Sequence, residues 1–536
     1  MRKGREEIQP ERQQKAYSLD MRRLISYRYI VLLTMVAISA CGSTPGTKPI
    51  EPTARTEAGQ ASDSPAAAQQ LADAMQLVSE KDWPQAQIAL RAVIDAKTFG
   101  SLPGDVQYRT LRVAGHVFAD HGQLKQGYDY LVRAGDMPQS TFEDQKALLM
   151  TSGRLQDWSA AMNTLTVIGQ RYPAQLSSLD VDLIADIVYE GKRSSPSQRL
   201  PLLQALYDAN WRLQGGVEPS ETWRDLTLML LDKGELTKAT DVATHVQDVY
   251  VLIAMRSDRR FDAVITANPA QFDIAAASER EYRSLQQAAD NTPHSLALKT
   301  QVIIMLLQQR HYEAALAAAD SVLLDIRSTN FPRQLFEDYD DSISGYLDVR
   351  ATTLERVGRW DEALEELTAG SNLHQKFWGN IDQIIDLAEL YCSLRRPHEA
   401  VATLARMTAR TNASGSMQVE LARLQAAVQL GDSKQVERSL QYLAKHRADG
   451  PSTYVEALVF ADKPDRAAHA LIEQLLNKDQ RQEVIVEVQT YDSVPGQPWD
   501  LEFDARWRTL IARKDVLAAI EKVGRVNAYP LEPHWY

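Results

Sequence analysis

Few side chains in this sequence of 536 residues have the types and the spacing that chemistry requires. His116 and His121 are five positions apart in one predicted helix, whereas two metal ligands on one helical face need a spacing of three or four. The acidic run 337–341 lacks the alternating ligands, the glycine and the distal glutamate of a calcium loop. No HExxH, GxSxG, CxxC or glycine-rich phosphate motif occurs. We therefore expect no catalytic residue, no metal site and no cofactor.

The thiol of Cys41 has a context that suggests a reaction. It follows a short basic stretch and the twelve uncharged residues 29–40. This run is too short to cross a bilayer, which takes about twenty apolar residues, but is typical of a secretory signal. The sequence Ile38-Ser39-Ala40-Cys41 resembles the lipobox of bacterial lipoproteins. The resemblance implies that residues 21–40 are a signal peptide and that Cys41 carries acyl chains such as palmitate.

A lipid anchor implies that the chain lies in the cell envelope. Gly42 stands where an Asp would retain such a lipoprotein in the inner membrane, so we expect the outer membrane, facing the periplasm. Residues 1–20 are interpreted as an overextended start. Residues 41–65 are rich in Gly, Ser, Thr, Pro and Ala, cannot offset the entropy of ordering, and are predicted to form a flexible tether.

The composition favours a folded protein that does not bind nucleic acid. Hydrophobic residues make up 44% and charged residues 24% of the chain, which is an ordinary globular balance. The net charge is -12, and because the first forty residues are basic, the chain from Cys41 onward carries about -16, which repels phosphate backbones. The second cysteine, Cys392, lies in a predicted helix and is expected to be a small buried hydrophobe.

A recurring turn between two predicted helices indicates a repeat. In each copy an aromatic residue, Leu or Pro is followed three positions later by a small residue, which lets two helices cross at close range. The intervals suggest a unit of about 34 to 40 residues with degenerate copies between. The pairs are Trp83 and Ala86, Leu124 and Gly127, Trp158 and Ala161, Leu236 and Ala239, Tyr312 and Ala315, Trp360 and Ala363, and Pro397 and Ala400.

Two copies resemble the tetratricopeptide repeat (TPR) family in order and spacing. Their packing positions are Leu387, Ala388, Tyr391, Ala400 and Leu404 in one copy, and Gly115, Phe118, Gly127, Leu131 and Ala134 in the other. Weaker copies lie around Phe261, Ser433 and Pro464, while residues 174–220 keep only the helical periodicity. The resemblance implies an all-α, right-handed superhelical solenoid of TPR-like hairpins over residues 66–476, with a concave groove.

In the family, side chains of the first helices that are not needed for packing face the ligand. The resemblance therefore implies candidate groove residues at Asp348, Thr352 and Glu355 in one repeat and at Asp382 and Glu389 in the next. These residues predict an acidic groove. Alternatively, they are ordinary solvated helix residues.

Residues 477–536 are predicted to be a capping segment. Phe503, Trp507 and Leu510 form one apolar stripe, and Asp515 and Gly524 can begin and end a further short helix. Residues 484–488 fit either a short strand or the end of a helix. Because repeats contact only their neighbours, removing the cap should loosen residues 380–480 and leave distant repeats unchanged.

The expected function is that of a non-enzymatic scaffold or adaptor in the cell envelope. Its groove would hold a peptide segment or a helix of a protein partner, with the membrane contacted through Cys41. An alternative is an outer-membrane regulator of a periplasmic enzyme such as a peptidoglycan synthase. A third alternative is an envelope enzyme with a site in residues 174–220, where no cluster of His, Asp and Glu occurs. The fold alone does not identify the partner.

Overall fold

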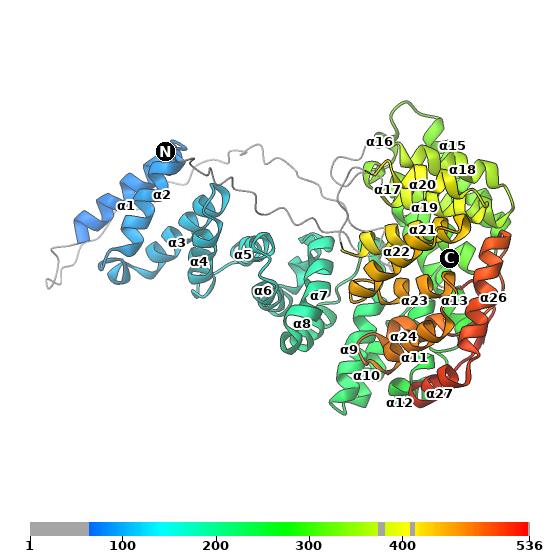
Figure 1. Ribbon diagram of the computed structural model, residues 1–536. Coiled ribbons are helices and arrows are strands. Elements are labelled where there is room, and N and C mark those ends of the chain that lie inside the picture. Colours follow the sequence, from blue (N-terminus) through cyan, green and yellow to red (C-terminus); the bar gives the residue numbers. More distant parts are fainter. Residues whose placement is uncertain (1–63, 374–380, 408–412, 534–536) are drawn as a thin grey trace, which may run out of the picture. The chain divides into compact units, whose positions relative to one another are not determined.

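The computed structural model describes residues 64–373, 381–407 and 413–533 (Figure 1). These residues form helices almost throughout, and the two short strands that they contain pair in parallel. The predicted all-α fold of stacked, TPR-like hairpins is confirmed. Within these ranges, none of the helices combines the length and apolar character that crossing a bilayer demands. The predicted signal peptide, Cys41 and most of the tether lie outside the described residues.

The described chain divides into two compact units, residues 64–212 and residues 213–533. The sequence did not suggest this boundary, which falls inside the predicted repeat region. The helices of the first unit are α1 (Ser64–Ser79), α2 (Trp83–Asp95), η2 (Phe99–Ser101), α3 (Gly104–Asp120), α4 (Leu124–Gly135), α5 (Phe142–Leu155), α6 (Trp158–Arg171), η3 (Pro173–Ser178), α7 (Val181–Ser194) and α8 (Pro196–Asp208).

The second unit contains both strands, and three helices, α25 to α27, follow its last repeat. Its elements are η4 (Gln214–Gly216), α9 (Ser220–Asp232), α10 (Leu236–Ala243), α11 (Val249–Ser257), η5 (Arg259–Phe261), α12 (Asp262–Ala267), α13 (Ile274–Asn291), α14 (Leu296–Gln308), α15 (Tyr312–Arg327), α16 (Pro332–Leu335), α17 (Tyr339–Arg356), α18 (Trp360–Ser371), α19 (Ile381–Ser393), α20 (Pro397–Leu404), α21 (Ala413–Leu430), α22 (Ser433–Lys445), α23 (Pro451–Phe460), α24 (Pro464–Leu476), α25 (Arg481–Glu487), β1 (Thr490–Tyr491), α26 (Pro498–Ile511), α27 (Lys514–Val523) and β2 (Ala528–Tyr529).

The predicted turn begins the second helix of a hairpin in all seven copies. Each aromatic residue, Leu or Pro of the pairs is the first residue of a helix, and each small residue is buried. At Gly127, for example, a Cβ would lie 2.4 Å from the backbone nitrogen of Ala119 in the preceding helix. The small residues therefore set how closely the two helices approach, as the sequence predicted.

A left-handed residue precedes each of these helix starts by two positions. Its successor donates a backbone hydrogen bond to the carbonyl five residues back, as Arg359 does to Leu354 at 2.8 Å, so the turn is a Schellman motif. The same arrangement begins α22 and α24. The left-handed residues are Lys81, Gly122, Gln156, Gly234, Arg310, Gly358, Arg395, Gly431 and Asp462. Only four of them are glycine, which is why the motif was not recognised from the sequence.

The C-terminal segment joins the end of the second unit to its beginning. Helix α25 packs against α11, and an isolated bridge pairs Asp258 with Gly524. A Cβ at Gly524 would lie 2.1 Å from the carbonyl oxygen of Ser257, so only glycine allows this approach. The segment is therefore more than the predicted cover for the last hairpin, because it closes the unit on itself.

The predicted apolar stripe of the C-terminal segment is buried. Phe503, Trp507 and Leu510 pack in one cluster with residues of α23 and α24. Residues 484–488 are helical up to Glu487, which decides between the two predicted alternatives. Gly524 ends α27 as expected, but this helix begins at Lys514, so Asp515 lies in its first turn and is not the cap.

Candidate interaction surfaces

The five predicted groove residues lie on two neighbouring helices of the second unit, and all are partly buried. Asp348, Thr352 and Glu355 belong to α17, and Asp382 and Glu389 belong to α19. Contacts between repeats hold two of these carboxylates. Gln383 donates to Asp348 at 2.9 Å, and Gln425 donates to Glu389 at 3.2 Å. Whether these residues bind a ligand stays a prediction.

Glu355 lies among carboxylates contributed by three helices. Burial raises the pKa of Glu355 to about 7, opposed by the charge of Arg356 and reinforced by the charges of Asp500 and Asp386. The hydroxyl of Thr352, in contrast, donates to the backbone carbonyl of Asp348 within its own helix, at 3.1 Å. The surroundings of Glu355 are therefore acidic, and one of the carboxylates that act on it, Asp500, belongs to α26. That these residues line an acidic groove stays a prediction.

Helix α26 covers part of the surface formed by α19, α23 and α24. The ring of Trp499 is buried in one cluster with Ala388 and Cys392, and its indole nitrogen donates to Gln425 at 3.1 Å. Asp500 accepts a hydrogen bond from Ser393 at 2.6 Å. An aromatic anchor with polar contacts on both sides is how a helical ligand is commonly held.

The last described residues contact helices from the first half of the second unit. Glu532 forms an ion pair with Arg356 at 2.8 Å, and both side chains are buried. Its backbone nitrogen donates to Gln308 at 3.0 Å, and its carbonyl accepts from the hydroxyl of Tyr250 at 2.7 Å. Sequence reasoning missed these residues, because pairings over such separations leave no periodic signal.

The same repeat positions in the first unit carry different side chains. Glu389 precedes Ala400, the small residue of its repeat, by a fixed number of positions. His116 precedes Gly127, and Met150 precedes Ala161, by the same number. The position of Asp382 is held in the same way by Arg109 in α3 and Glu143 in α5. His116, Met150, Arg109 and Glu143 are all exposed. We refer to these four residues as the first-unit surface.

Helices α3 and α5 are held side by side by a buried carboxylate. Asp144 lies in the first turn of α5 and forms a capping box with Thr141. Its carboxylate accepts from Tyr108 and lies 2.9 Å from Nε of Arg112. These contacts hold the pKa of Asp144 below its usual value, against the opposing effect of burial. The first-unit surface therefore lies on two helices that buried polar contacts join to each other.

The remaining candidates for chemistry have structural roles. Burial raises the pKa of the Cys392 thiol to about 12, so the reactive thiolate is disfavoured. His121 stacks on Trp83 with ring centroids 4.1 Å apart, while His116 is exposed. Within the described residues, no three His, Cys, Asp or Glu side chains come together as metal ligands would.

No protein-family model and no curated protein matches this chain. Among solved structures, it is similar to the APC/C hetero-tetramer Cut9–Hcn1, with 12% identity, a TM-score of 0.27 and coverage of 84% of this chain and 94% of that one. For yeast Tom70 the values are 11%, 0.29, 86% and 100%. For the TPR domain of P58(IPK) they are 12%, 0.19, 77% and 100%. TM-scores this low support no inference about function.

Proposed function

We propose that this chain is a non-catalytic scaffold that binds a helical segment of a protein partner. The observation that carries the proposal is the seat of α26, where helices of the second unit hold another helix by Trp499 and Asp500. Repeat scaffolds bind partners with residues that packing leaves free. The second unit has part of this surface covered by its own chain, and the first unit presents the equivalent positions to solvent.

The first-unit surface is the proposed site for the partner. It combines a cationic side chain, Arg109, an acidic one, Glu143, and the flexible apolar side chain of Met150, which is 46% exposed. Methionine adapts its shape to irregular apolar partners, and the flanking charges add orientation. The acidic residues of the second unit would contribute only where α26 leaves them accessible.

Site-specific photo-crosslinking in intact cells tests this proposal. A photoreactive residue at His116 or Met150 should give one discrete adduct, and a residue at the exposed Asp129 of α4 should give none. Arg109→Glu should reduce the adduct formed from Met150. Equal adducts at all three positions would contradict the proposal, because they would indicate random collisions. A cell-wall enzyme in the adduct would favour the regulatory alternative.

We further propose that Cys41 anchors this scaffold in the cell envelope, facing the periplasm. The support is the order of basic residues, apolar run, small residues and cysteine in the sequence. Each buried methylene contributes about 0.8 kcal/mol, so several acyl chains would hold the protein almost irreversibly. Cys41→Ser should abolish labelling by radioactive palmitate and leave an uncleaved precursor. A wild-type chain that is neither labelled nor cleaved would eliminate the anchor without affecting the crosslinking proposal.

A further inference from the structure

A cleft of about 470 Å³ lies where the beginning and the end of the second unit meet. It is formed by residues far apart in the sequence, from η5, from α24 and α25, and from α27. We call it the basic cleft. Its lining residues are Arg259, Arg260, Leu476, Arg481, Lys522 and Val523.

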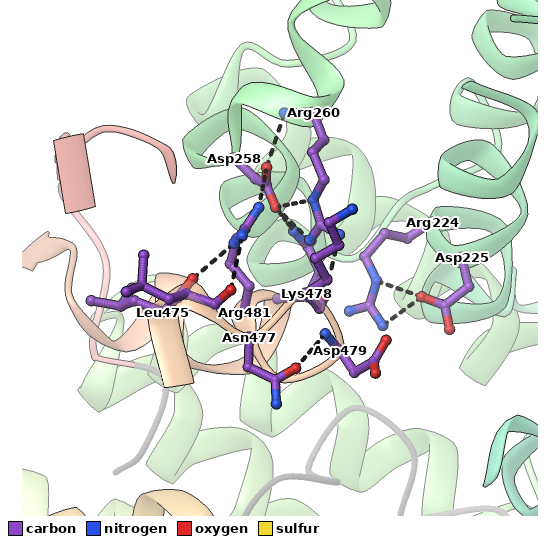
Figure 2. A network of polar contacts seen from close by, with 11 residues as sticks. Arg224, Asp225, Asp258, Arg260, Leu475, Asn477, Lys478, Asp479 and Arg481 are labelled. Atoms are coloured by element: carbon purple, nitrogen blue, oxygen red, sulfur yellow. Dashed lines mark hydrogen bonds and ion pairs between the residues drawn. The ribbon is translucent and has the colours of Figure 1, made fainter. Parts of the chain in front are cut away.

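Two of the arginines are fixed by a shared carboxylate. Asp258 is fully buried, and its Oδ2 accepts from Nε and Nη2 of Arg260 at 2.9 and 2.7 Å (Figure 2). Nη1 of Arg481 lies 3.9 Å from Oδ1 of the same carboxylate, and its Nε donates to the carbonyl of Leu475 at 2.8 Å. These side chains are therefore already ordered, which lowers the entropy lost when a ligand binds.

The other two cations keep hydrogen-bond donors available. Arg259 is exposed and uses its Nε to donate to the carbonyl of Glu521 at 3.1 Å. Among the described residues, nothing accepts a hydrogen bond from its Nη atoms or from the exposed ammonium of Lys522. Arg259 and Arg481 donate to carbonyls near the ends of helices, and this capping explains in part why they lie there. It does not explain the position of Lys522.

The charge balance of the basic cleft points to an anion. Four cationic side chains line it, and the buried carboxylate of Asp258 pairs with two of them, Arg260 and Arg481. In a chain with a net charge of -12, such a concentration of positive charge is unusual, and it costs repulsion unless an anion offsets it. Leu476, which is 40% exposed, adds an apolar wall. The ligand should therefore combine an anionic and an apolar part.

We propose that the basic cleft binds the phosphate group of a small amphiphilic phosphate ester. Arg259 and Lys522 contact the phosphate oxygens, with Arg260 and Arg481 supplying the surrounding positive charge. Guanidinium groups suit phosphate because their planar forks match its oxygens. The same chemistry occurs in a lipid headgroup and in a soluble phosphate ester. This proposal does not depend on the proposed function of the first unit.

Calorimetric titration of the purified chain tests the proposal with three probes. They are inorganic phosphate, glycerol 3-phosphate and monomeric dihexanoyl phosphatidylglycerol, each at an ionic strength of about 0.15 M so that weak surface attraction is screened. We expect saturable binding of one molecule per chain. The double variant Arg259→Gln/Lys522→Gln should weaken it at least about tenfold. The matched control Lys434→Gln/Arg438→Gln, which removes two exposed cations of α22, should leave it unchanged.

The outcomes separate the sources and can overturn the proposal. Tighter binding of the short-chain lipid than of glycerol 3-phosphate identifies a headgroup, and the reverse order identifies a soluble ester. Arg259→Lys/Lys522→Arg should keep binding, which excludes a defect in folding. If none of the probes saturates, or if both glutamine double variants weaken binding equally, the basic cleft is not an anion site.

Discussion

The two units use the same turn and present different surfaces. In the first unit, Arg109 and His116 occupy positions that face solvent, while in the second unit Asp382 and Glu389 occupy the equivalent positions and are partly buried. Within the second unit, α26 lies against α19, α23 and α24, and Glu532 contacts Tyr250 of α11. The comparison shows that the packing residues of a repeat determine the structure of its hairpin. Whether a partner can reach the surface of that hairpin depends on segments outside the repeat.

Removing the C-terminal segment should have the largest effect. A stop codon at Gln497 removes Trp499, Phe503 and Glu532 and exposes the residues that they contact. Loss of one buried aromatic side chain alone typically costs about 3 to 5 kcal/mol. Hydrogen exchange should accelerate over roughly residues 250–480, and remain slow in residues 64–212. Acceleration confined to 380–480, as the sequence suggested, would mean that the closure contributes little.

Breaking the buried ion pair should cost less than the truncation. Glu532→Ala removes the carboxylate that forms an ion pair with the buried guanidinium of Arg356, and we expect a loss of about 3 to 5 kcal/mol in the free energy of unfolding. The matched control is Asp515→Ala, which removes a partner of Arg513 at an exposed site. Chemical denaturation measures the free energy of unfolding of both variants. Equal losses in the two variants would contradict the prediction that the buried ion pair contributes more than the exposed one.

The hairpin turn should respond equally in both units. Ala161→Leu in the first unit and Ala400→Leu in the second unit place a larger side chain at a fully buried helix crossing, which should destabilise the affected unit by about 1 to 3 kcal/mol. Ala369→Leu, at an exposed position of α18, is the control. If chemical denaturation shows that both buried variants are as stable as wild type, the small residues do not set the distance at which the helices cross.

Protonation of Glu355 should make the second unit sensitive to pH. Its pKa in the folded chain is about 7, above the usual 4.5, so the folded state holds the proton more tightly. Stability should therefore fall as pH rises from about 4.5 to about 7, by roughly 3 kcal/mol, and then level off. Glu355→Gln should remove this fall, while Glu365→Gln at an exposed site of α18 should not. If the stability of wild type and of Glu355→Gln depends on pH in the same way, the pH dependence does not come from Glu355.

The hairpins could be predicted from the sequence because their determinants are local. A small residue three positions after Trp360 or Trp158 fixes both the helix start and the crossing, and both signals lie within one turn. The closure of the second unit could not be predicted, because Asp258 and Gly524 are brought together by folding alone. Glu355 was proposed as a groove residue from its repeat position alone, and that role stays a prediction. The contacts of α26 with α19, α23 and α24 could not be foreseen, because only folding brings these helices together.

The closure of the second unit has a consequence for the order in which the chain folds. The first unit consists of contacts between neighbouring hairpins, which can form as soon as those residues leave the ribosome. Tyr250 cannot meet its partner Glu532 until almost the whole chain has been synthesised. Contacts over such separations carry a large loop-closure entropy and slow folding, so the second unit should complete its structure last.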